Sequence, residues 1–100
     1  MVNYTSMKTV YTTNTSEKSS SYTCQKDTTA IVMFLGNTYT GSGSVKLNGE
    51  TLSSISGSSS ARYMNILNLK QGDVIKFTFK TSATNNYRLF GIILHEDDAF

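Results

Sequence analysis

The chain has neither proline nor tryptophan, and its 100 residues include one cysteine and one histidine. A single cysteine excludes a disulfide within the chain, so Cys24 is interpreted as a small buried hydrophobic residue, with an interchain bridge or a reactive thiol as alternatives. Alanine is scarce, and strong helix formers never cluster. Serine and threonine instead supply 28 residues. This composition is typical of a β-rich fold with a polar surface.

Long apolar runs and dense charge are also missing. No apolar stretch approaches the roughly 18 residues of a membrane span, which argues against membrane insertion. The start, Met1–Tyr4, lacks the charged-then-apolar pattern of a signal peptide, so we expect either release by another route, as for a virion, or a domain cut from a longer chain. The formal net charge is only +2, and the nine Lys and Arg are scattered. Nucleic acid is therefore not an expected partner, because binding along phosphates needs a dense basic face.

Apolar and polar residues alternate with a period of two, and the sequence has no convincing stripe with the 3.6-residue period of a helix. The alternation begins in Met7–Thr12. Val45–Leu52 predicts a tight hairpin, because Asn48-Gly49 suits the two positive-φ positions of a type I′ turn. The polar stretches Thr13–Ser21 and Ser53–Ser60 are predicted as loops, the second of them mobile.

One hundred residues suffice for one two-layer core and are too few for two. The sequence therefore predicts a single domain over residues 1–100, in which residues 1–6 can link to an upstream region. Eight or so short strands at this spacing predict an all-β fold, an antiparallel β-sandwich of the jelly-roll type.

The final predicted strand, Tyr87–His95, has large apolar side chains on both faces. Side chains alternate across a strand. The two faces therefore carry, respectively, Leu89, Gly91 and Ile93, and Phe90, Ile92 and Leu94. A monomer covers one set, and leaving the other in water forgoes about 1.5–3 kcal/mol for each large side chain. We expect Phe90, Ile92 and Leu94 to form the interface of a homotrimer, in which the small Gly91 permits close approach of strands.

The catalytic interpretations are weak. His95 is followed by the acidic run Glu96–Asp98, but neighbouring side chains on one strand end point to opposite faces, whereas metal ligands must converge. We interpret the run as a solvated acidic tail, with a divalent-cation site as the alternative. No Gly-x-Ser-x-Gly turn accompanies the many serines. The sequence therefore predicts a chain that is not an enzyme and that has neither a cofactor nor a metal.

Tyrosine beside arginine or asparagine suggests saccharide binding. An aromatic ring covers the apolar side of a sugar, and planar polar groups hydrogen-bond its hydroxyls. Tyr39 on its glycine-rich loop, the pair Arg62 and Tyr63, and the pair Tyr87 and Arg88 each lie in or near a predicted loop. These five residues are the candidate ligand-binding residues. The ordinary alternative is that cross-strand Tyr pairs and exposed Arg only stabilise the sheets.

Two segments near the end of the chain resemble a known family. The turn Leu69–Val74 and the strand Phe90–Leu94 are similar to the closing strands of the C1q and tumour-necrosis-factor jelly rolls. In that family a leucine-x-x-glycine-aspartate turn precedes a phenylalanine-glycine strand on the trimer axis. The resemblance implies a C1q/TNF-like jelly roll that assembles as a trimer.

Upstream segments resemble the head domains of bacteriophage tail fibres and related receptor-binding proteins. The similarity is carried by the tyrosine-rich strands, the Lys26-Asp27 turn before Ala30–Val32, and the Val45–Gly49 hairpin. It implies a trimeric host-adhesion head at a fibre tip of the virion, extracellular, that binds a bacterial cell-surface saccharide. Two alternatives remain: a capsid or tail-fibre module or trimerisation cap without a ligand, and a C1q/TNF-like secreted binding domain.

Overall fold

The computed structural model describes residues 6–13, 16–38, 41–81, 88–96 and 98–100, with side chains at 19–37, 41–80, 89, 91–96 and 98–100. The described residues form strands and no helix. The strands are β1 (Ser6–Thr13), β2 (Ser16–Thr23), β3 (Thr28–Thr38), β4 (Ser42–Leu47), β5 (Glu50–Ser56), β6 (Ser59–Leu69), β7 (Val74–Thr81) and β8 (Arg88–His95). No helix in this part of the chain could cross a membrane.

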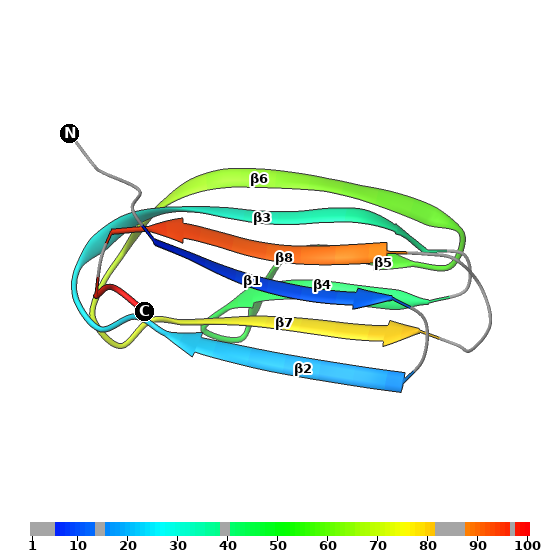
Figure 1. Ribbon diagram of the computed structural model, residues 1–100, viewed down its shortest axis with the longest axis horizontal. Helices are drawn as coiled ribbons and strands as arrows, with labels where there is room; N and C mark the ends of the chain where they lie inside the picture. Colours follow the sequence, from blue (N-terminus) through cyan, green and yellow to red (C-terminus); the bar gives the residue numbers. More distant parts are fainter. Residues whose placement is uncertain (1–5, 14–15, 39–40, 82–87, 97) are drawn as a thin grey trace.

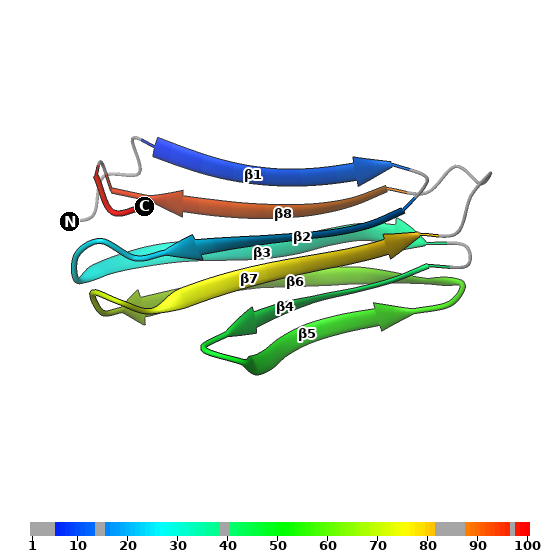
Figure 2. The same cartoon turned by 90° about the horizontal axis from the view of Figure 1, so that it is seen from below.

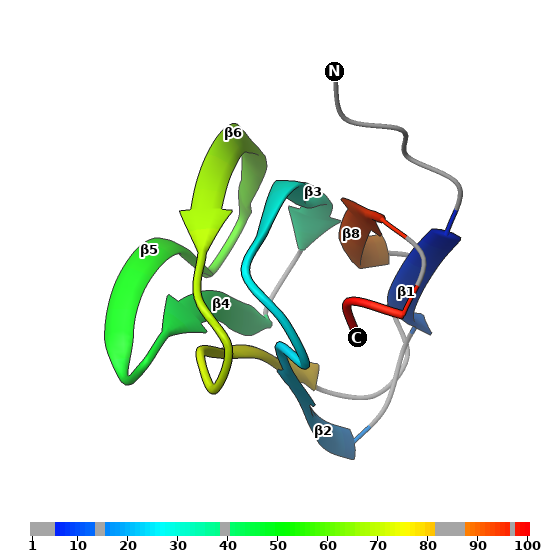
Figure 3. The same cartoon turned by 90° about the vertical axis from the view of Figure 1, so that its left-hand side faces the viewer.

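The strands form two four-stranded sheets, ordered β1-β8-β3-β6 and β2-β7-β4-β5, and the paired strands are antiparallel. Figure 1 and the end-on view in Figure 3 show the sheets as two layers. The chain crosses repeatedly from one layer to the other, and only the β4–β5 hairpin joins consecutive strands of one sheet. This is the arrangement of a jelly roll. The predicted all-β antiparallel sandwich is confirmed.

The core between the layers is aromatic. Phe34 from one sheet and Phe77 and Phe79 from the other are fully buried. Their rings stack, with centroids 5.9 Å apart for Phe34 and Phe79 and 6.3 Å apart for Phe77 and Phe79. Cys24 is buried at the edge of this core, where its thiol donates to the Lys26 carbonyl at 2.9 Å, and burial raises the pKa of the thiol. The expected role of Cys24 as a small buried residue is confirmed.

The predicted hairpin is present, with positive φ at Asn48 (51°) and Gly49 (86°). Its asparagine also joins a second turn. Asn48 Oδ1 accepts from the Val74 backbone N–H at 2.9 Å, and Asn48 Nδ2 donates to Asp73 Oδ1 at 3.0 Å. The β4–β5 and β6–β7 turns are thereby fixed to each other at one end of the sandwich.

Two predicted loops are strands instead. Most of Thr13–Ser21 belongs to β2, which pairs with β7 along its length. Ser53–Ser60 is divided between β5 and β6, and Ile55 anchors it in the core with 5% of its surface exposed. Backbone pairing with an apolar neighbour sustains these serine-rich segments, although their own side chains give no alternating pattern.

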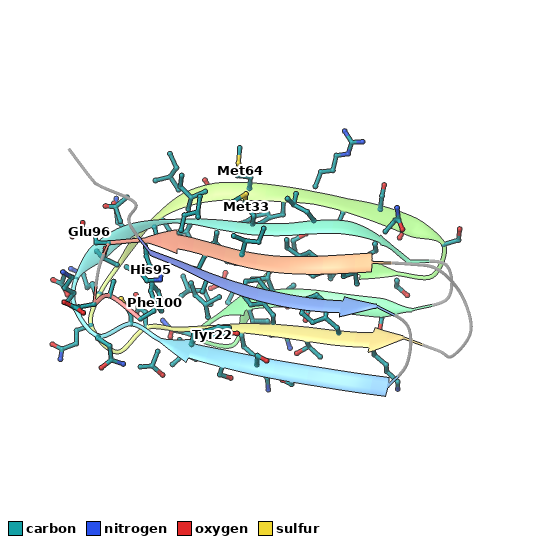
Figure 4. The ribbon with its side chains drawn as sticks, in the orientation of Figure 1. Tyr22, Met33, Met64, His95, Glu96 and Phe100 are labelled. Atoms are coloured by element: carbon teal, nitrogen blue, oxygen red, sulfur yellow. The ribbon has the colours of Figure 1, made fainter. Side chains whose placement is uncertain are left out.

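Of the acidic run, Asp98 is exposed and Glu96 half-buried, but the residues on either side of the run are not solvated as a tail would be. His95 is 2% exposed and packs against Phe100, with ring centroids 4.9 Å apart and the ring planes tilted by 59°. Ala99 is fully buried, and its carbonyl accepts from the Gln25 N–H at 2.7 Å. Figure 4 shows His95 and Phe100 together at the end of the sandwich where β8 finishes. The final residues therefore fold back and close this end of the core, because the aromatic ring and Ala99 provide apolar surface to bury.

Candidate functional site

The outer side of the β1-β8-β3-β6 sheet is apolar where the structure describes its side chains. Along β3 the inward residues Ala30, Val32 and Phe34 are fully buried. The intervening residues Ile31, Met33 and Leu35 point the other way and are half-buried. The sheet thus presents large apolar side chains on both of its faces, and only one face packs on the second sheet.

Strand β6 extends this surface. Met64 and Ile66 are 68% and 63% exposed, and the strand register places Met64 opposite Met33 and Ile66 opposite Ile31. Figure 4 shows Met33 and Met64 on the side of the sheet that faces away from β2 and β7. Single exposed apolar residues are ordinary, but contiguous ones mark interaction sites.

Strand β8 lies on the other side of β3 and completes the surface. Leu89, Gly91 and Ile93 point into the core, as the sequence predicts. Ile92 and Leu94 are half-buried and lie next to Met33 and Ile31. We define the outer apolar face as the following residues: Ile31, Met33, Leu35, Met64, Ile66, Ile92 and Leu94. The side chain of Phe90 is outside the described residues, and its Cα pairs with that of Leu35.

Gly91 has a different role from the expected one. It faces the core, and a Cβ built on it would overlap the ring of Phe77 in the opposite sheet. The absent side chain therefore makes room for an aromatic ring inside the sandwich. The expectation that Gly91 permits close approach of strands between subunits is wrong, because the residue does not lie on the outer face.

A groove of about 450 Å³ hollows the outer surface between β3 and β6. Its lining residues are Met33, Leu35, Gly36, Asn37, Ser60, Ala61, Arg62 and Met64. Gly36 and Ala61 are partners in the strand register and lie on the core side of the sheet, so the groove is formed by the outward-facing side chains that alternate with them. Arg62 is the one charged residue in the lining, and it makes no ion pair within the described part of the chain.

The structure places the predicted ligand-binding residues in different ways. Tyr39 and Tyr87 lie outside the described residues, as does the side chain of Arg88. Arg62 is exposed and borders the groove, whereas Tyr63 is half-buried and packs against the core. Neighbouring residues on one strand face opposite sides, so Arg62 and Tyr63 do not share a site.

The backbone nevertheless brings one end of three strands together. Asn37, near the end of β3, pairs with Ser60 at the start of β6 and with Arg88 at the start of β8. Asn37 and Ser60 line the groove beside Arg62, and sequence reasoning missed both. The only sequence feature that could have indicated this position is the polar Asn37 at the end of an otherwise apolar strand.

A second pocket, of about 360 Å³, lies at the opposite end of the sandwich. It is lined by Asp27, Thr28, Thr29, Asn68, Leu69, Lys70 and Glu96. Several of its polar groups already have partners within the protein. Asp27 Oδ1 accepts from the Gln71 N–H at 2.9 Å, and the Thr29 hydroxyl donates to Asn68 Oδ1 at 2.9 Å. Within this pocket, such internal pairing leaves fewer groups for a ligand.

The described residues around His95 do not form a catalytic site. Its Nδ1–H donates to the Glu96 carbonyl at 2.6 Å, and its Nε2 is buried without a hydrogen-bond partner. No cluster of three or more His, Cys, Asp or Glu that could hold a metal occurs among the described residues. Within the described residues, His95 therefore has a packing role at the end of the core that Ala99 and Phe100 cover.

No family model and no curated protein matches this chain. It is similar to the CBM36-1 domain of a multidomain xylanase from the hindgut metagenome of Trinervitermes trinervoides, with a TM-score of 0.37, 21% identity, and coverage of 84% of this chain and 74% of that chain. It is also similar to the carbohydrate-binding module CBM36 in complex with calcium and xylotriose, with a TM-score of 0.36, 12% identity, and coverage of 96% and 92%. At these low TM-scores, the fold is assigned from the strand order and register of this chain alone.

Proposed function

We propose that this chain is the head domain of a homotrimeric, non-catalytic adhesion protein that binds a saccharide of the bacterial cell surface at the tip of a phage fibre. The observation that carries the proposal is the outer apolar face. Met64 and Ile66 are about two-thirds exposed, and each would gain about 1–2 kcal/mol from burial of the part that is still exposed. A second copy of the chain offers a matching apolar surface.

Closure of an assembly around a symmetry axis fits the position of this face in the molecule. The face spans β8, β3 and β6 of one sheet. Copies arranged around a closed axis cover such a face without leaving an open end, whereas an unclosed contact would propagate into a filament. The resemblance of Phe90–Leu94 to strands on a trimer axis supports three copies, and Ile92 and Leu94 belong to both descriptions.

Saccharide binding is supported by the groove and its surroundings. The groove joins apolar side chains to an amide, a hydroxyl and a guanidinium, which is the combination that a sugar ring with its hydroxyls requires. Three copies on one axis multiply a weak contact through effective concentration, which suits attachment to a repetitive cell surface.

Light scattering on the purified protein at micromolar concentration tests the assembly, and we expect the mass of a trimer. Ile66→Asp places a charge on the outer apolar face and should dissociate the trimer. Thr78→Asp is the matched control, because Thr78 lies on the outer side of the other sheet between the inward-facing Phe77 and Phe79. A stable wild-type monomer contradicts the proposal.

Adsorption to bacterial cells and a glycan array tests the recognition step. We expect the wild-type trimer to bind cells and at least one saccharide. A trimer that binds no saccharide and no cell would instead be a trimerisation cap, which needs the same apolar face and no ligand. The same protein sample therefore distinguishes the two functions.

A further inference from the structure

The groove between β3 and β6 has a charge pattern that selects among saccharides. Its lining contains one cation, Arg62, and no acidic residue. Within the described residues, the one ion pair joins Lys26 to Glu96 at 3.8 Å, in another part of the molecule. Among the described residues, the guanidinium of Arg62 therefore has no anionic partner.

We propose that this groove binds a sugar that bears a carboxylate, such as a sialic or uronic acid, and that Arg62 pairs with the carboxylate. The inference rests on the proposed saccharide binding and specifies its ligand class. A guanidinium presents two parallel N–H groups that match the two oxygens of a carboxylate. A cationic ligand would be repelled, and a neutral sugar would leave this donor pair with water alone.

The rest of the lining suits the rest of such a ring. Met33 and Leu35 provide apolar contact for the C–H side of the sugar, and methionine adapts its shape to irregular surfaces. The amide of Asn37 and the hydroxyl of Ser60 can each donate and accept with ring hydroxyls. The volume of about 450 Å³ lies within the ordinary range for small-ligand sites.

The groove shares Met33, Leu35 and Met64 with the outer apolar face, but it does not reach Ile66. Ile66 lies four positions beyond Arg62 on the same strand, which is about 13 Å at the rise of a β-strand. The Arg62 end of the groove lies where β6 begins, beside Asn37 and Ser60. The end of the outer apolar face that holds Ile31, Ile66 and Leu94 is therefore assigned to subunit contact, and the Arg62 end to a charged ligand.

Titration calorimetry on the wild-type trimer tests the ligand class. The probes are 3′-sialyllactose, a glucuronate-containing disaccharide and the methyl ester of each. We expect at least one acid to bind at least tenfold more tightly than its own ester, because esterification removes the charge and keeps the ring. The preference should weaken as salt rises. The two acids distinguish a sialic from a uronic ligand.

The second arm uses variants at the same ligand concentrations. Arg62→Gln should lose at least tenfold in affinity for the preferred acid and little for the ester, and Arg62→Lys should retain part of the affinity. Lys76→Gln, which removes an exposed cation from the other sheet, is the control and should bind as the wild type does.

Equal binding of acid and ester, or an unchanged affinity of Arg62→Gln, would overturn the assignment while saccharide binding itself stands. Binding of neutral sugars alone would overturn it in the same way. Failure of every saccharide to bind would remove the proposed recognition function, and this inference with it. The ester comparison uses only wild-type protein, so it holds even if an Arg62 variant folds poorly.

Discussion

At the residue scale, Gly91 tests how closely the two sheets pack. A methyl group at this position would overlap the Phe77 ring, so Gly91→Ala must displace the ring or the strand. Overpacking of this kind costs about 1–3 kcal/mol in the free energy of unfolding. Urea denaturation should show this loss, and the double variant with Phe77→Leu should lose less than the sum of the two single changes. An additive result would place the two residues out of contact.

Asp73 makes the stability of the fold depend on pH in the acidic range. The backbone N–H of Lys70 and the side-chain amide of Asn48 both donate to its carboxylate, and they hold its pKa below the usual 3.8. A carboxylate with a lowered pKa stabilises the fold at neutral pH, and the benefit is lost as the pH falls through the folded-state pKa.

We therefore expect Asp73→Ala to be less stable than the wild type near pH 7, and the difference in unfolding free energy to shrink as the pH falls below about 3.8. Chemical denaturation at several pH values measures this. Glu50→Ala removes an exposed carboxylate beside the neighbouring hairpin and is the control. A difference that grows on acidification would contradict the assigned hydrogen bonds.

At the scale of the element, the β4–β5 hairpin depends on Asn48 in two ways. The residue adopts positive φ, and its side chain bonds to Asp73 and to the backbone of Val74. Asn48→Ala loses both and should destabilise the protein by about 1–3 kcal/mol. Asn48→Gly keeps the backbone freedom and loses only the side-chain bonds, so its cost in thermal or urea unfolding should be smaller. Equal costs for the two variants would mean that backbone freedom contributes nothing.

The elements that were predicted correctly carry their signal within a few neighbouring residues. Asn48-Gly49 specifies its turn locally, and apolar and polar residues alternate along Ile75–Lys80, within the segment that forms β7. β2 has no such pattern, because its partner β7 supplies the apolar side chains. The groove could not be predicted, since it depends on a register that places Leu35 beside Arg62. Alternation, correctly applied, does predict that Arg62 and Tyr63 diverge.

At the scale of the whole molecule, self-association should couple to folding. If the outer apolar face is buried only in the trimer, mass action makes the melting temperature rise with protein concentration. We expect this rise for the wild type between micromolar and hundred-micromolar samples in calorimetry. The double variant Ile31→Ser and Ile66→Ser should show a lower melting temperature that no longer depends on concentration. If the melting temperature of the wild type does not change with protein concentration, the outer apolar face stays exposed to water.

The pairing of β1 with β8 sets the order of events during synthesis. Ser6 is the register partner of His95, and β8 also supplies the neighbour of β3. A ribosome must therefore release almost the whole chain before the first strand finds its partner, and until then β3 exposes an unpaired edge beside an apolar surface. Contacts between such distant positions make folding slow, on the order of milliseconds to seconds for all-β domains. Nascent chains of this protein should consequently depend on chaperone protection until their last strand emerges.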